Sequence, residues 1–254
     1  WIRNTSMPQL SLTPARRGMV IAGAALVVAT WIYLVLFRPT DWESVAGSAE
    51  ALITLAGYLI GAALLLAGTV PSLPARTIAI IPIALVLNIV VGQIIGSSGI
   101  PLYIDSVGTI LVAALAGPIA GLATGTLSSV VWGLLNPMAL PFAAVSAATG
   151  FLSGWAIQKG AFSKIWKVIV SGAIIGIICG MLAAPVAAFV YGGTAGVGTG
   201  ALTSLFRELG NSLIASVTMQ SLISDPLDKA VVFLIVWAAV KSLPKRTRES
   251  LQPR

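Results

Sequence analysis

The sequence predicts an all-α integral membrane protein with about eight transmembrane helices. Hydrophobic residues make up 57% of the 254-residue chain, and charged residues only 9%. Soluble domains carry roughly a quarter charged residues, so this chain has too few charges to cover a surface in water. The mean hydropathy of +0.97 agrees with this assignment.

The apolar runs indicate where the membrane spans lie. A helix that crosses a hydrocarbon core of about 30 Å needs about 20 apolar residues. Runs of this kind occur at residues 18–37, 50–70, 77–95, 103–117, 119–135, 141–158, 166–190 and 226–243. The fourth and fifth meet at Gly117-Pro118, which predicts a tight helical hairpin. Residues 192–200 predict a non-helical link, and residues 201–224 an amphipathic stretch too polar for an ordinary span.

The basic residues predict the orientation, because cytoplasmic loops carry an excess of lysine and arginine. With the N-terminus inside, the inner segments hold Arg3, Arg16, Arg17, Arg76, Lys159, Lys164, Lys167, Lys241, Lys245, Arg246, Arg248 and Arg254. Only Arg38, Arg207 and Lys229 fall outside, and the acidic residues lie mostly at outer span ends. We therefore expect a multi-pass protein of a bacterial-type cell (inner) membrane with both termini cytoplasmic. The positive charge is read as a topology signal, and no nucleic-acid partner is expected.

Several kinds of chemistry are absent from the sequence. The chain contains no histidine, which excludes imidazole metal sites and histidine-based catalysis. No phosphate-binding loop with a Gly-Lys pair is present, nor a Gly-x-Ser-x-Gly elbow. We expect no enzyme activity, no catalytic residue, no metal and no cofactor.

Small residues recur at four-residue spacing and form smooth stripes on the predicted helices. The stripes are Gly57/Gly61, Gly117/Gly121/Gly125, Gly150/Gly154 and Gly172/Gly176/Gly180. Such stripes let a neighbouring helix approach closely. Packing within the chain is the favoured interpretation of most of them.

Asp105 is the single carboxylate in the apolar stretch IPLYIDSVGTILVAALAGPIAGLATG, residues 100–125. It has two interpretations. In the first, it caps the outer end of the following helix, where a carboxylate accepts hydrogen bonds from backbone N–H groups. Alternatively, it lies at the mouth of an outward-facing pocket, as a ligand contact or as the charge partner of Arg207.

The same stretch resembles the second and third helices of substrate-binding S components of energy-coupling factor (ECF) transporters. These typically have a short extracellular loop, an aspartate and an apolar helix ending in Gly-Pro-x-x-Gly. Residues 187–246 resemble the family's C-terminal part, with an Asp-Lys pair opening the last helix and a Leu-Pro-basic ending. The resemblance implies a cytoplasmic segment (1–17), an N-terminal helix pair outside the family pattern (18–70), a six-helix core (75–244) and a cytoplasmic basic tail (245–254).

The resemblance implies capture of a small vitamin-like molecule, followed by uptake with a membrane coupling subunit and cytoplasmic ATPase subunits. A small-residue face at Ala75 and Ala79 matches the spacing at which the family docks its coupling subunit. The expected substrate-binding residues are Asn88, Gln93, Tyr103, Asp105, Trp132, Asn136, Arg207, Glu208 and Asn211. For Asn88, Gln93 and Asn136, bonding between helices is an equal alternative.

Two other functions are compatible with the sequence. In the first, the chain is a non-transporting scaffold or regulatory subunit of a larger membrane complex, and the two additional spans provide surface for its partners. Or it is an ion-driven secondary transporter, which ranks last because its acids are expected at span ends rather than at mid-membrane.

Overall fold

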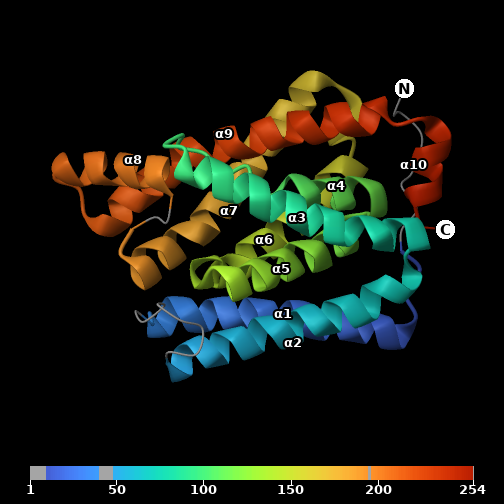
Figure 1. Cartoon of the computed structure of the whole chain (residues 1–254), viewed down its shortest axis with the longest axis horizontal. Helices are drawn as coiled ribbons and strands as arrows, with labels where there is room; N and C mark the ends of the chain where they lie inside the picture. Colours follow the sequence, from blue (N-terminus) through green and yellow to red (C-terminus); the bar gives the residue numbers. More distant parts are fainter. Residues whose placement is uncertain (1–9, 40–47, 194–195, 254) are drawn as a thin grey trace.

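The computed structural model describes residues 10–39, 48–193 and 196–253. Throughout these ranges the regular secondary structure is helical (Figure 1). The helices are α1 (Pro14–Phe37), α2 (Ala49–Thr69), η1 (Val70–Ser72), α3 (Ala75–Ser97), α4 (Val107–Ala116), α5 (Pro118–Leu135), η2 (Pro137–Phe142), α6 (Ala143–Gln158), η3 (Ala161–Ser163), α7 (Ile165–Tyr191), α8 (Val197–Glu208), α9 (Leu213–Ser242) and α10 (Lys245–Leu251).

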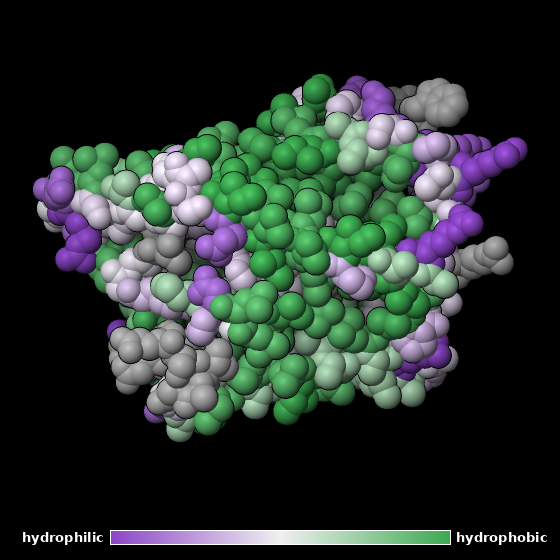
Figure 2. Space-filling view, in the orientation of Figure 1, coloured by the Kyte–Doolittle hydropathy of each residue, from purple (hydrophilic) through white to green (hydrophobic). Residues whose placement is uncertain are grey.

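The outer surface of this bundle is that of a membrane protein. Figure 2 shows a broad hydrophobic surface across the middle of the molecule, with hydrophilic residues gathered toward its two ends. In the described part of the chain, six helices are long and apolar enough to cross a membrane: α1, α2 with η1, α3, α5, η2 with α6, and α7. The predicted multi-pass helical membrane protein is confirmed at this level, whereas the count of eight spans is not.

The two predicted spans that do not reach this standard are α4 and α9. The span expected at 103–117 is a helix of only ten residues, because α4 begins at Val107. Ten residues of α-helix are about 15 Å long, roughly half the thickness of a hydrocarbon core. The preceding residues, 98–106, are not helical and run toward the interior of the molecule.

Helix α9 differs most from the prediction. The last span was expected to start at residue 226, with Asp225, Asp228 and Lys229 at its outer end. Instead α9 is a continuous helix of 30 residues from Leu213 to Ser242, with Pro226 in its interior. The first part of the predicted amphipathic stretch belongs to α8, which begins at Val197, inside the predicted link. The three charged residues therefore lie near the middle of α9 rather than at the beginning of a helix.

The helix pair α1–α2 is attached to the rest of the bundle on the side of α5 (Figure 1). Two hydrogen bonds from its aromatic residues join it to the core. The Trp31 Nε1–H donates to the carbonyl of Leu182 at 3.0 Å, and the Tyr58 hydroxyl donates to the carbonyl of Pro141 at 3.3 Å. The pair does not cover Ala75 and Ala79, which are both exposed on α3.

The start of α1 and the end of α10 lie at the same end of the molecule (Figure 1). Two hydrogen bonds connect segments at this end. The Arg16 guanidinium donates to the Ser72 hydroxyl at 3.2 Å, and the Thr77 hydroxyl donates to the Leu251 carbonyl at 2.5 Å. Through the second bond the basic tail folds back as a short helix against α3.

The glycine stripes pack against neighbouring helices of the same chain, as expected. A Cβ atom on Gly121 or Gly150 would overlap the backbone of the other, which shows how closely α5 and α6 cross. Likewise, a Cβ on Gly172 or Gly176 would overlap the α9 backbone between Asp225 and Ala230. These contacts fix the positions of the helices that surround the charged centre of α9.

We predict that the same substitution has opposite effects at two helical glycines. Gly150→Ala forces α5 and α6 apart, and overpacking of this kind costs about 1–3 kcal/mol. Gly18→Ala on α1 meets no atom within 4 Å. It is expected to be neutral or to stabilise by up to about 1 kcal/mol, because alanine favours a helix over glycine. Thermal unfolding of both variants in one detergent measures the difference, and equal melting temperatures would contradict the close crossing.

Candidate functional site

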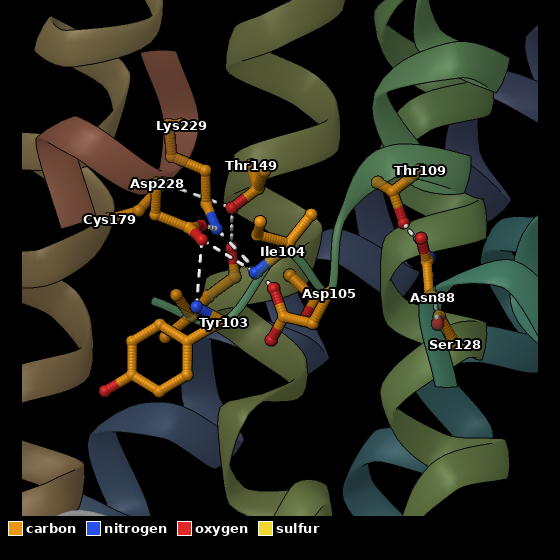
Figure 3. A network of polar contacts seen from close by, with 12 residues as sticks. Asn88, Tyr103, Ile104, Asp105, Thr109, Ser128, Thr149, Cys179, Asp228 and Lys229 are labelled. Atoms are coloured by element: carbon orange, nitrogen blue, oxygen red, sulfur yellow. Dashed lines mark hydrogen bonds and ion pairs between the residues drawn. The ribbon is translucent and has the colours of Figure 1, made fainter. Parts of the chain in front are cut away.

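The loop between α3 and α4 is held inside the protein by one carboxylate of α9. Asp228 Oδ1 accepts the backbone N–H groups of Tyr103 at 2.9 Å and Ile104 at 2.6 Å (Figure 3). Ile104 has a φ of 49°, in the left-handed region that β-branched residues rarely occupy. The two hydrogen bonds to the fully buried Asp228 side chain stabilise this strained turn.

The amino group of Lys229 joins the same loop to α9. Its Nζ lies 2.5 Å from Asp228 Oδ2 and 3.5 Å from Asp105 Oδ1. The lysine side chain is 6% exposed and that of Asp105 is 33% exposed. One buried ammonium therefore bridges a carboxylate of the loop and a carboxylate of its own helix (Figure 3).

The first half of α9 buries its polar face and exposes its apolar face. The buried residues include Ser216, Gln220, Ser221, Ser224, Asp225, Asp228 and Lys229. The exposed residues include Met219, Leu222, Ile223 and Leu227. This is the inverse of a helix on a water-soluble protein, and it is the arrangement expected where lipid surrounds the bundle and polar groups face its interior.

The polar face of α9 lines an internal cavity of about 150 Å³. The other walls come from the α3–α4 loop, α5, η2, α6 and α7. The lining residues are Tyr103, Asp105, Ser106, Ser129, Trp132, Asn136, Met138, Ala139, Phe142, Val145, Ser146, Thr149, Ala183, Ala187, Gln220, Ser221, Asp225 and Lys229. A cavity with a few converging polar groups and several aromatic rings is typical of small-molecule binding.

Gln220 is the most conspicuous polar residue of this wall. Its side chain is fully buried, yet among the described residues neither its amide nitrogen nor its amide oxygen has a hydrogen-bond partner. A buried polar group left unpaired costs about 1–3 kcal/mol of stability. Such a group facing a cavity is well placed to hydrogen-bond a molecule inside it.

Four of the nine predicted binding residues line the cavity: Tyr103, Asp105, Trp132 and Asn136. Gly92 of α3 gives two of them room, since a Cβ there would lie 2.7 Å from the Trp132 ring and 2.9 Å from Asp105 Cβ. Asn136 also accepts a hydrogen bond from the Met138 N–H at 3.2 Å, which caps η2. It therefore combines a local structural role with a place in the cavity wall.

The other five predicted residues are placed elsewhere. Asn88 is buried and joins three helices, because it donates to Thr109 at 2.8 Å and Ser128 at 3.1 Å and accepts from the Gly108 N–H at 2.7 Å (Figure 3). Bonding between helices, the alternative left open for Asn88, is what the structure shows. The remaining four lie away from the cavity: Gln93 is exposed on α3, Arg207 and Glu208 are exposed on α8, and Asn211 donates to the Phe206 carbonyl at 3.0 Å.

Asp105 has neither of the partners that the sequence suggested. Residue Ser106, not Asp105, is the N-terminal cap of α4, and no side chain caps that helix. Its charge partner is Lys229 rather than Arg207, which is exposed on α8. The cap and the Arg207 pair are therefore corrected, while the placement of Asp105 in a cavity wall agrees with the alternative interpretation.

Four cavity or network residues were not anticipated: Gln220, Asp225, Asp228 and Lys229. The sequence contains a signal for them. Asp228 and Lys229 follow Asp225 by three and four positions, so all three share one face of a continuous helix. Ser221, four positions before Asp225, extends that face by one turn. Ionisable residues on one face of a membrane helix indicate a functional site.

The described residues contain no group of three or more histidine, cysteine, aspartate or glutamate side chains arranged to hold a metal ion. Cys179 is buried and accepts a hydrogen bond from the Thr149 hydroxyl at 3.2 Å. The carboxylates and the amide of the cavity are hydrogen-bonding and charged groups suited to an organic ligand.

Comparisons with known proteins give no further assignment. No family model, no curated protein and no solved structure matches the chain. The functional argument is therefore built on the cavity and on the sequence motifs that surround it.

We predict that Asp228 is far more important for stability than a surface carboxylate. Asp228→Ala leaves Lys229 and two backbone N–H groups without this partner, and breaking a buried ion pair costs about 3–5 kcal/mol. The matched control is Glu249→Ala, which removes a surface pair of 3.7 Å with Lys245 and is expected to cost about 0–1 kcal/mol. Thermal unfolding in detergent compares the two, and similar melting temperatures would show that Asp228 does not hold the loop.

Proposed function

We propose that this protein is the membrane-embedded substrate-capture subunit of an ATP-driven ECF-type importer for a small vitamin-like organic molecule. The observation that carries the proposal is the cavity within a bundle of membrane helices, lined by aromatic rings and by a few converging polar groups. Such a cavity fits capture of a small molecule. ATP hydrolysis would be supplied by separate cytoplasmic subunits, joined through a membrane coupling subunit.

The segments that carry the resemblance to S components also build the cavity. Residues 100–125 contribute Tyr103 and Asp105, and residues 187–246 contribute Gln220, Asp225 and Lys229. This coincidence supports the proposal, because motifs of a binding subunit are expected to surround its ligand. It also favours a capture subunit over a scaffold, which has no use for a polar cavity.

An ion-driven secondary transporter is the second candidate, and one observation now favours it. Its low rank depended on acids at span ends, but Asp225 and Asp228 are buried near the middle of α9. Buried acids within membrane helices mark ion and proton pathways in many transporters. Non-helical backbone beside such a site, here residues 98–106, is a feature of that class as well.

The first experiment identifies what accompanies the protein. Mild-detergent purification from its native membrane, followed by mass spectrometry, is expected to recover two ATPase subunits, a coupling subunit and a bound small molecule. Recovery of a large complex with no ATPase and no ligand would instead support a scaffold.

Reconstitution separates the two transporter classes. The chain alone in proteoliposomes is expected to bind its co-purified ligand without accumulating it, because a capture subunit depends on its partners for uptake. Accumulation driven by a proton or sodium gradient, without ATPases, would reject the capture subunit and establish a secondary transporter.

The exposed small-residue face of α3 is the proposed docking surface for the coupling subunit. We predict that Ala79→Trp abolishes co-purification of the ATPases while the ligand remains bound, since a bulky side chain holds the partner helix away. The control is Ala25→Trp, a substitution at an exposed alanine of α1, which is expected to leave the complex intact. If both variants retain the ATPases, or if both lose them, docking at Ala75 and Ala79 is contradicted.

A further inference from the structure

The charged groups around the cavity are unequal in number. Three carboxylates, Asp105, Asp225 and Asp228, surround a single ammonium group, that of Lys229. The Lys229 Nζ lies within ion-pair distance of Asp105 and Asp228 and is shared between them. In the described part of the chain no other lysine or arginine lines the cavity. The site therefore holds more carboxylates than ammonium groups.

Asp225 is the cavity carboxylate that forms no direct ion pair with Lys229. Its side chain is buried, lines the cavity and forms no ion pair within 4.0 Å among the described residues. Its hydrogen-bonding neighbour is the Ser221 hydroxyl one turn earlier on α9, which carries no charge. A buried carboxylate in this position is stabilised either by a proton or by a cation that enters the cavity.

The walls beside Asp225 suit an organic cation. Trp132, Tyr103 and Phe142 line the cavity, and aromatic faces attract positive charge. The volume of about 150 Å³ is of the order that holds one benzene-sized ring in other proteins. The ligand is therefore compact, with one ring or a group of similar size.

Gln220 provides an independent observation that points to a ligand. Both of its amide atoms are buried and unpaired at the cavity wall. An amide offers donors from its nitrogen and an acceptor at its oxygen. A ligand that satisfies both atoms carries a hydrogen-bond acceptor and a hydrogen-bond donor close together, as an amide does.

We propose that the cavity binds a compact organic cation that also carries an amide-like group, with Asp225 as its counter-ion and Gln220 as its hydrogen-bond partner. This inference rests on the proposed capture function only in treating the cavity as a ligand site, and it names the class of substrate. A neutral or anionic molecule would form no ion pair with an ionised Asp225.

Three matched probes test the charge and the amide separately. 1-Methylnicotinamide carries a fixed positive charge and an amide, 3-methylbenzamide has nearly the same shape without the charge, and N-methylpyridinium has the charge without the amide. They are used as probes of chemistry rather than as expected substrates. Binding to the purified full-length chain, dialysed to remove co-purified molecules, is measured by titration calorimetry.

The parent protein is expected to bind 1-methylnicotinamide about tenfold or more tightly than either of the other two, as one close charge pair or one buried amide contact provides. In Asp225→Asn the preference over 3-methylbenzamide disappears, whereas the surface control Glu249→Gln retains it. In Gln220→Met the preference over N-methylpyridinium disappears. A protonated, neutral Asp225 predicts instead that Asp225→Asn changes nothing.

The comparison of probes on the parent protein requires no variant to fold. Equal affinities, tighter binding of 3-methylbenzamide, or no binding of any probe would overturn the proposal. The probe titrations test the ligand class, whereas co-purification of ATPases tests the proposed importer, so either can fail without the other. Cation-selective binding by a protein that recovers no ATPases would keep the site and reject the importer. Recovery of ATPases together with a preference for the neutral probe would support the importer and reject the cation site.

Discussion

The hydrogen bonds from the loop before α4 to Asp228 are the interaction on which the site depends. In a membrane, non-helical backbone is tolerated only where protein groups satisfy it. Asp228 does this for Tyr103 and Ile104, at 2.9 and 2.6 Å, and keeps Ile104 in a conformation that isoleucine rarely adopts. Because the loop is held at mid-helix depth, Tyr103 and Asp105 become part of the cavity wall instead of an outer loop.

The position of Asp228 depends in turn on how closely α9 approaches α7. Gly172 and Gly176 contact the α9 backbone, and a Cβ on Gly180 would lie 3.1 Å from the Asp225 side chain. This approach shields the charged turn of α9 from the lipid. The desolvation cost of these charges is offset by the shared Lys229 ammonium and by the loop N–H groups. The glycines of α7, which the sequence identified only as packing positions, thus allow α9 to carry charged residues at its centre.

Most of the helices could be predicted from the sequence, and the charged centre could not. The apolar runs locate α1, α2, α3, α5 and α7 to within a few residues, because length and hydropathy determine them. For α9, Pro226 and its charged neighbours are typical of the beginning of a helix at the membrane surface. Only the packing against α7 and the α3–α4 loop shows that the helix continues through them. Similarly, the sequence suggested only Arg207 as a charge partner for Asp105, and the three-dimensional packing places Lys229 beside it.

The N-terminal helix pair has a structural connection to the cavity although none of its described residues line it. Segment η2 forms part of the wall through Met138, Ala139 and Phe142. The Tyr58 hydroxyl of α2 donates to the Pro141 carbonyl, and the Tyr191 hydroxyl of α7 donates to the Met138 carbonyl at 2.7 Å. These two bonds join η2 to α2 and to α7. The α1–α2 pair therefore reinforces one wall of the cavity, and it leaves Ala75 and Ala79 of α3 exposed.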